Sequence, residues 1–185
     1  MDLQLHESFT EVDPLEWNSV LDEAITNTPF QRYEYQSGWW KTLGGGEWQQ
    51  GRLVLVTARE ADRLRGIAPL FLTEHENRPA LLLTGSIEIS DYLDLIIGSA
   101  DVEPFVSELL DYLHKSFPVE WGLLDWYNIP EDSPTLPALK SASLKRGWTY
   151  TVEVFRPTPY IPLPSDFEAY LSALDKQAPE QRRKG

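Results

Sequence analysis

The segment from Ser90 to Ile97, Ser-Asp-Tyr-Leu-Asp-Leu-Ile-Ile, holds the best local arrangement of groups that could do chemistry. In an extended strand, alternate side chains point to opposite faces. One face would then carry Tyr92, Asp94 and Ile96. The opposite face would carry Leu93, Leu95 and Ile97. A carboxylate and a phenol on one face of an inner strand could orient an amine, act as a base or donate a hydrogen bond. Tyr92 and Asp94 are therefore candidate substrate-binding residues.

A structural interpretation of the same segment competes with this one. Asp91 could cap a turn, and Asp94 could face solvent or a buried arginine. The sequence favours the structural interpretation, because perturbed carboxylates serve structure as well as catalysis. Both interpretations stay open at this stage, and no catalytic residue is assigned.

Other familiar chemistries find little support along the chain. There are no cysteines, and His6, His75 and His114 lie far apart without the spacing of a zinc-binding helix, so no metal site is expected. No serine lies in a Gly-x-Ser-x-Gly elbow. The glycines at 44–46 follow a predicted helix and precede a strand, which indicates a helix stop and a turn rather than a phosphate-binding loop.

Composition limits the protein class. The 185 residues are 42% hydrophobic with a formal net charge of -13. Such an acidic surface disfavours direct binding of nucleic acid, whose affinity comes mainly from Lys and Arg. No apolar run approaches the length needed to cross a bilayer, and no signal peptide opens the chain. Together with the absence of cysteine, these features predict a cytoplasmic protein without a membrane span.

Charge is unevenly distributed along the chain. The last ten residues, Lys176 to Gly185, hold four of the sixteen basic side chains and one acid, whereas the first 175 hold 28 of the 29 acids. This segment could be a basic arm. It could also be the opening of a further element.

The residues that could do chemistry must be positioned by a mixture of helices and strands. Apolar periodicity predicts helices at 14–25, 36–43, 101–115 and 135–146 and one opening at Ser165, with strands at 53–57, 64–72, 80–84, 92–97, 121–127 and 148–155. Asp13 and Ser165 are the expected helix caps. Pro69 is expected at a bulge or on an unpaired side of its strand. Four successive strands suit an antiparallel meander, and the later alternation suits parallel or mixed pairing, so the fold class is α/β or α+β.

Several short signatures occur in an order that can be compared with known families. They are Thr28-Pro29-Phe30-Gln31, Leu64-Arg65-Gly66-Ile67-Ala68-Pro69-Leu70, Gly85 followed by Ser90-Asp91-Tyr92-Leu93-Asp94, and Ile161-Pro162-Leu163-Pro164 before Phe167-Glu168-Ala169-Tyr170-Leu171. On these signatures the chain resembles the amino-terminal half of the FemAB-like and CelD-like (cellulose-biosynthesis-type) acyltransferases of the GNAT superfamily.

The resemblance implies a GNAT-like mixed, largely antiparallel sheet flanked by helices, incomplete relative to a two-half architecture. Residues 1–163 would form the amino-terminal half-domain, and residues 164–185 would begin a truncated second half that holds the acyltransferase domain proper. The implied activity is transfer of an acyl or aminoacyl group to an amine, with acetyl-CoA, another acyl-CoA or aminoacyl-tRNA as donor. Tyr92 and Asp94 would orient the acceptor.

The same resemblance sets expectations for cofactors and partners. No cofactor is expected for these 185 residues, because no donor site is recognisable in them, and the isolated chain is expected to be inactive. The expected partners are a missing carboxy-terminal half or a second copy, with an amine-bearing small molecule or an envelope or polysaccharide precursor as acceptor. The alternative is a non-catalytic acidic module that binds another protein.

Overall fold

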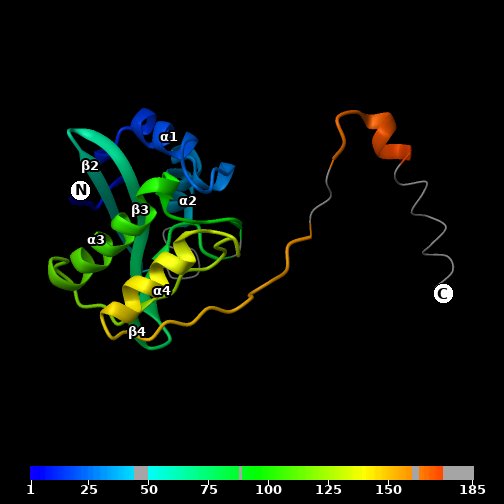
Figure 1. Ribbon diagram of the computed structural model, residues 1–185. Coiled ribbons are helices and arrows are strands. Elements are labelled where there is room, and N and C mark those ends of the chain that lie inside the picture. The colour runs from blue at the N-terminus through cyan, green and yellow to red at the C-terminus, as the bar shows by residue number, and fades with distance from the viewer. Residues whose placement is uncertain (44–49, 88, 160–162, 173–185) are drawn as a thin grey trace. The chain divides into compact units, whose positions relative to one another are not determined.

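The computed structural model describes residues 1–43, 50–87, 89–159 and 163–172 and divides into two units, Met1–Glu153 and Val154–Gly185 (Figure 1). This division comes earlier than the boundary predicted after residue 163. The glycines at 44–46 and the basic segment 176–185 lie outside the described residues. The sheet, its helices and the sites lie in the first unit.

The first unit is built on one mixed sheet. Its strands follow the order β1-β2-β3-β4-β6, and β5 pairs with β3 beside β4. The strands are β1 (Asp2–His6), β2 (Arg52–Glu60), β3 (Arg63–His75), β4 (Arg78–Leu83), β5 (Ile96–Ile97) and β6 (Leu123–Leu124). All pairs are antiparallel except β4 with β6, which is parallel.

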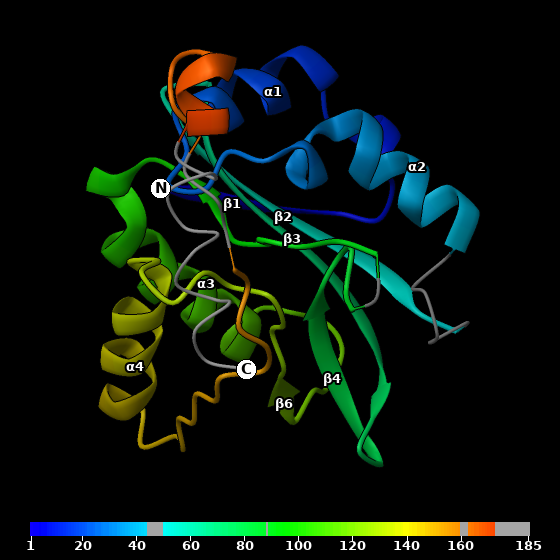
Figure 2. The ribbon, with the colours of Figure 1, turned by 90° about the vertical axis from the view of Figure 1, so that its right-hand side faces the viewer.

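Helices cover both faces of this sheet (Figure 2). The helices α1 and α2 lie on one face, and α3 and α4 lie on the other. Their bounds are α1 (Pro14–Asp22), α2 (Tyr33–Leu43), α3 (Val102–Lys115) and α4 (Thr135–Lys145), with single 3-10 turns at Phe9–Glu11, Pro29–Gln31 and Ser99–Asp101. The predicted mixed, mostly antiparallel sheet flanked by helices is confirmed. Among the described residues, no helix combines the length and apolar character needed to cross a membrane.

Alternation along β2 places the core on both sides of the sheet. Val54 and Val56 belong to the cluster that packs against α3 and α4. Leu53 and Leu55 belong to the cluster that packs under α1. All four are buried, because the sheet is covered by helices on both faces and each strand therefore reads as a nearly continuous apolar run.

Two-residue turns connect β2, β3 and β4. Ala61 and Asp62 have φ of 48° and 64°, and Glu76 and Asn77 have φ of 50° and 59°. Two successive positive φ values define the type I′ turn, whose twist matches that of the flanking strands. The hairpin predicted around residues 59–63 is therefore confirmed.

Strand β3 changes partners halfway along its length. Gly66 and Ile67 pair with β5, whereas Leu70 to His75 pair with β4. Pro69 lies between the two pairings and opposite Leu55 of β2. Its carbonyl accepts from the backbone N–H of Thr84 at 2.8 Å. On the side of β3 that faces β4 and β5, Pro69 is paired with neither strand. Its missing N–H therefore lies on an unpaired side of the strand, which is one of the two predicted placements.

Gly66 leaves room for a side chain of β5. A Cβ at this position would lie 2.6 Å from Cδ1 of Ile97. A larger residue here would therefore require the end of the Ile97 side chain to shift.

The strand predictions were wrong at four places. The segment Tyr92–Ile97 is a strand only at Ile96–Ile97, and Trp121–Tyr127 only at Leu123–Leu124. Residues 148–155 form no strand, and β1 was not predicted. Strand formation depends on partners distant in the chain, which β propensity does not register.

The helix predictions were better, because helix ends are set by local groups. Asp13 caps α1 as predicted, its carboxylate accepting from the backbone N–H of Leu15 at 2.6 Å. In the second unit the cap of the helix at 167–172 is Asp166 rather than Ser165. The Asp166 carboxylate accepts from the backbone N–H of Ala169 at 2.8 Å.

Candidate functional site

Asp94 lies in the interior, where its side chain is held by hydroxyl groups. The residue is only 1% exposed. Its carboxylate accepts from Thr26 Oγ1 at 2.9 Å, Ser133 Oγ at 2.5 Å and Thr135 Oγ1 at 2.6 Å. The backbone N–H of Leu95 donates a fourth bond at 2.8 Å. We refer to Asp94, Thr26, Ser133 and Thr135 as the Asp94 cluster.

Three separate parts of the chain form the Asp94 cluster. Thr26 follows α1, Asp94 precedes β5, and Ser133 and Thr135 lie at the start of α4. Ser133 Oγ also accepts from the backbone N–H of Thr135 at 3.1 Å. A carboxylate beside a helix N-terminus is favoured by the helix dipole. The cluster therefore joins the helical layers of the two faces through the loop that precedes β5.

Burial raises the pKa of the Asp94 carboxyl above its ordinary value, because desolvation disfavours the charged form. The hydrogen bonds from Ser133, Thr135, Thr26 and the Leu95 amide oppose that shift, and the net direction is still upward. The side chain is thus a buried acid whose ionisation depends on its hydroxyl donors.

The geometry favours a structural role for Asp94. Each of its two oxygens accepts two hydrogen bonds, which occupies the usual lone-pair directions of a carboxylate. An acceptor amine would have to displace one of those donors. As far as the chain is described, neither solvent nor a buried arginine faces this side chain, so the structural interpretation was wrong about the surroundings of Asp94.

Tyr92 and Asp94 do not share a surface. Tyr92 has φ of 54° and is 38% exposed, whereas Asp94 is buried. The apolar half of the prediction is confirmed, because Leu93, Leu95 and Ile97 all belong to one core cluster. Thr26, Ser133 and Thr135 were missed. Their sequence contained no signal that they converge on position 94.

The chain between β4 and β5 is hydrogen-bonded to the chain that follows β6. Beyond the paired residues, the Asp125 N–H still bonds to the Leu81 carbonyl at 3.1 Å. Three residues later, the Asn128 carbonyl accepts instead from the Leu93 N–H at 3.0 Å. The Asn128 side-chain amide donates to the carbonyls of Ile87 and Ser90 at 3.2 and 2.7 Å. The loop thus replaces β4 as the neighbour of the chain after β6.

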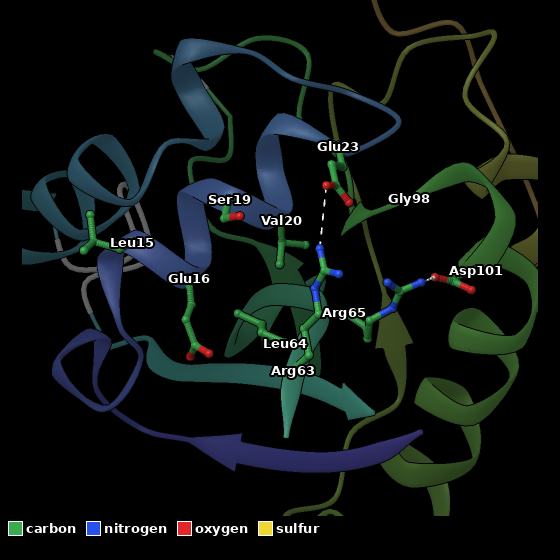
Figure 3. A pocket seen from close by; sticks show the side chains of 10 residues that line it. All are labelled: Leu15, Glu16, Ser19, Val20, Glu23, Arg63, Leu64, Arg65, Gly98 and Asp101. Carbon is green, nitrogen blue, oxygen red and sulfur yellow. Dashed lines mark hydrogen bonds and ion pairs between the residues drawn. The ribbon is translucent and has the colours of Figure 1, made fainter. Parts of the chain in front are cut away.

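An open groove lies between α1 and β3, and sequence reasoning did not predict it (Figure 3). Its volume is about 370 Å³. We call it the α1–β3 groove. It is lined by Leu15, Glu16, Ser19, Val20, Glu23, Arg63, Leu64, Arg65, Gly98 and Asp101.

Ion pairs of very different quality line the α1–β3 groove. Arg65 Nη2 lies 2.6 Å from Asp101 Oδ2, and the two side chains are 31% and 25% exposed. Arg63 Nη2 lies 3.7 Å from Glu23 Oε1, and these side chains are 65% and 68% exposed. Glu16 is bound by Arg59 of β2 at 2.5 Å. The Arg63–Glu23 pair is therefore the weakly held one, and it joins the two walls of the groove.

A third polar group lies at the end of β3. His75 Nε2 lies 2.9 Å from Asp125 Oδ2, and Tyr127 Oη lies 3.4 Å from the same nitrogen. Within the described part of the chain, no three His, Cys, Asp or Glu side chains are arranged to hold a metal ion. The His75 group joins the end of β3 to the chain after β6.

Comparison with models of protein families, with curated proteins and with solved structures found no match. The function must therefore be inferred from the residues. The relevant features are a buried carboxylate that accepts four hydrogen bonds, a parallel strand pair beside the loop before β5, and an open groove whose walls carry opposite charges.

Proposed function

We propose that residues 1–153 are a GNAT-like half-domain of an N-acyltransferase. The half-domain acts as a scaffold and forms part of an acceptor-substrate cleft, without a donor site of its own. The observation that carries the proposal is the parallel β4–β6 pair in an otherwise antiparallel sheet. A GNAT-type donor site requires a pair of strands that separate, and in this unit the loop before β5 is hydrogen-bonded to the chain after β6.

Two observations support the absence of an acyl-CoA site. The hydrogen bonds of Leu93 and Asn128 would obstruct a donor that enters beside the end of β6. The first turn of α3, the first α-helix after β4, carries Glu103, and the neighbouring Asp101 is paired with Arg65. A helix N-terminus binds a diphosphate through its free N–H groups and its positive dipole end, and carboxylates placed there oppose an anion.

The Asp94 cluster fits a scaffold role. It fixes the start of α4 to the loop before β5 and to the chain after α1, so the helices on both faces keep a fixed relation to the sheet. Tyr92, the other candidate substrate-binding residue, is exposed and could contact an acceptor. Its role in orienting an amine stays a prediction.

The first test is titration of the purified 185-residue chain with acetyl-CoA by isothermal calorimetry. We expect no binding at millimolar ligand. Saturable binding with one-to-one stoichiometry would overturn the assignment as a half without a donor site.

The second test concerns the acyltransferase assignment itself. The coding frame beyond Gly185 is extended as far as it stays open, and the encoded protein is assayed for transfer from acetyl-CoA to a panel of amines. Acyl transfer by the extended protein, and none by the 185-residue chain, is the expected result. An open frame whose product transfers no acyl group to any amine would contradict the proposal.

The alternative function, a protein-binding module, is favoured by one observation. Trp148 and Tyr150 are half-buried, and Trp148 stacks edge-on against Trp121 with ring centroids 5.6 Å apart. Val152, the next residue with the same period-two spacing, is 62% exposed. Light scattering on the purified chain distinguishes the cases: a dimer indicates a self-association surface, and a monomer that captures no partner argues against the module.

A further inference from the structure

The α1–β3 groove contains charges of opposite sign that are held apart on facing walls. Glu23 comes from the end of α1, and Arg63 comes from β3. Figure 3 shows the two side chains reaching toward each other across the groove. Their closest atoms are 3.7 Å apart, beyond hydrogen-bond distance, so each retains the capacity to bond to another group.

Separating Arg63 from Glu23 costs little. Both side chains are about two-thirds exposed, and exposed ion pairs contribute little to stability. The other charges are already committed, since Glu16 is bound by Arg59 and Asp101 is bound by Arg65. A ligand entering the groove therefore finds one available carboxylate and one available guanidinium.

The backbone around Glu23 fixes the orientation of such a ligand. Glu23 is the C-cap residue of α1. The carboxyl end of a helix carries a partial negative charge, which favours a cation and disfavours an anion. An ammonium group is thus favoured at the Glu23 end, and a carboxylate at Arg63, where a guanidinium can bind it through two hydrogen bonds.

The groove is large enough to hold the apolar part of a ligand as well as two charged groups. Val20 and Leu64 line it, and its volume of about 370 Å³ falls within the range of about 300 to 1,000 Å³ found for small-molecule sites. Gly98 has φ of -69°, and a Cβ there would contact only the Glu23 carbonyl oxygen, at 3.8 Å. A side chain could therefore be added at position 98 without backbone strain.

We propose that the α1–β3 groove binds a small zwitterion, an α-amino acid, with its carboxylate on Arg63, its ammonium on Glu23 and its side chain against Val20 and Leu64. This inference goes beyond the scaffold role and does not depend on it. Acyl transfer by an extended protein and amino-acid binding in this groove can each fail while the other holds.

In the experiment, the ¹⁵N-labelled 185-residue chain is titrated with L-leucine, and the backbone amide chemical shifts are monitored by NMR. We expect saturable shifts at Ser19, Val20, Leu64 and Gly98, with a dissociation constant of about 1 mM. N-acetyl-L-leucine lacks the ammonium, and L-leucine methyl ester lacks the carboxylate. Each should bind at least about tenfold more weakly, the equivalent of one lost charged contact. Equal binding of all three, or no shifts at these residues, would overturn the proposal.

Variants test the assignment of each charge. Arg63→Gln and Glu23→Gln should each weaken L-leucine binding about tenfold, and the matched control Arg78→Gln, which loses the exposed Arg78–Glu76 pair, should leave it unchanged. Gly98→Val should abolish binding by filling the groove while both charges remain. Undiminished binding in Gly98→Val, or equal losses in Arg63→Gln and Arg78→Gln, would show that the groove is not the site.

Discussion

The Asp94 cluster and the α1–β3 groove use the same kind of group, a carboxylate, in opposite ways. Asp94 is 1% exposed and accepts four hydrogen bonds, three of them from neutral hydroxyls. Glu23 has a side chain that is 68% exposed and a single cationic neighbour at 3.7 Å. Among the residues that the structure describes, Asp94 has no cationic partner, yet its carboxylate joins three parts of the fold. Burial and full hydrogen bonding, rather than charge pairing, separate a structural acid from one that is available to a ligand.

The largest expected effect is on the buried side of this comparison. Replacing Asp94 by Ala leaves three hydroxyls and one amide without their acceptor in the interior. We expect a loss of about 3 kcal/mol in the free energy of unfolding, since each unsatisfied buried group costs about 1 to 3 kcal/mol. Urea denaturation followed by tryptophan fluorescence measures it. Asp91→Ala, which removes an exposed carboxylate three residues earlier, is the control and should change stability by less than about 0.5 kcal/mol. Similar losses of unfolding free energy in Asp94→Ala and Asp91→Ala would contradict the structural role of the buried carboxylate.

The pH dependence of stability gives the next effect. The folded-state pKa of Asp94 is raised, so its contribution to stability is complete below the ordinary value near 3.8 and is lost as pH rises through the folded-state pKa. Relative to Asp94→Asn, the wild-type chain should therefore lose stability as pH rises from 4, by about 1.4 kcal/mol for each unit of the shift.

His6 should show the opposite slope. Burial lowers its folded-state pKa below 6.5, so stability falls as pH drops below that value. Comparison with His6→Gln isolates this contribution. Denaturation curves between pH 4 and 7 check both residues. A gain in stability with rising pH that depends on Asp94 would contradict the assigned direction of its pKa.

A smaller difference is expected between the two ion pairs of the groove. Double-mutant cycles should give a coupling energy of about 1 kcal/mol for Arg65 with Asp101, whose side chains are at most 31% exposed and 2.6 Å apart. Arg63 with Glu23 should give less than about 0.3 kcal/mol. Denaturation of the four variants of each cycle supplies the numbers. Coupling of equal size would mean that the Arg63–Glu23 pair does not open readily.

The smallest effect is expected at Tyr92. Its side chain is 38% exposed, and only its backbone carbonyl receives a described hydrogen bond, from Thr28 Oγ1 at 3.4 Å. Tyr92→Ala should change the unfolding free energy by less than about 0.5 kcal/mol. A loss as large as that of Asp94→Ala would place Tyr92 in the structural cluster after all.

Sequence alone predicted the parts of the fold that are determined locally. The cap at Asp13, the apolar stripe of α3 and the charged hairpin between β2 and β3 all follow from neighbouring residues. The candidate site was different. Position 94 was identified, but its role depends on Thr26 and Thr135, which lie 68 and 41 residues away. The groove depends on which strand lies under α1, and helix periodicity carries no such information.

The exchange of partners along β3 imposes an order on assembly during synthesis. The β2–β3 and β3–β4 hairpins close through two-residue turns and can form as soon as their strands leave the ribosome. Gly66 and Ile67 must wait for Ile97 and Ile96, some thirty residues further along the chain. Until those residues emerge, one half of β3 exposes an unpaired edge of apolar residues beside a finished hairpin. Slow translation between residues 75 and 97 would prolong that interval, and the nascent chain would be most vulnerable to aggregation there.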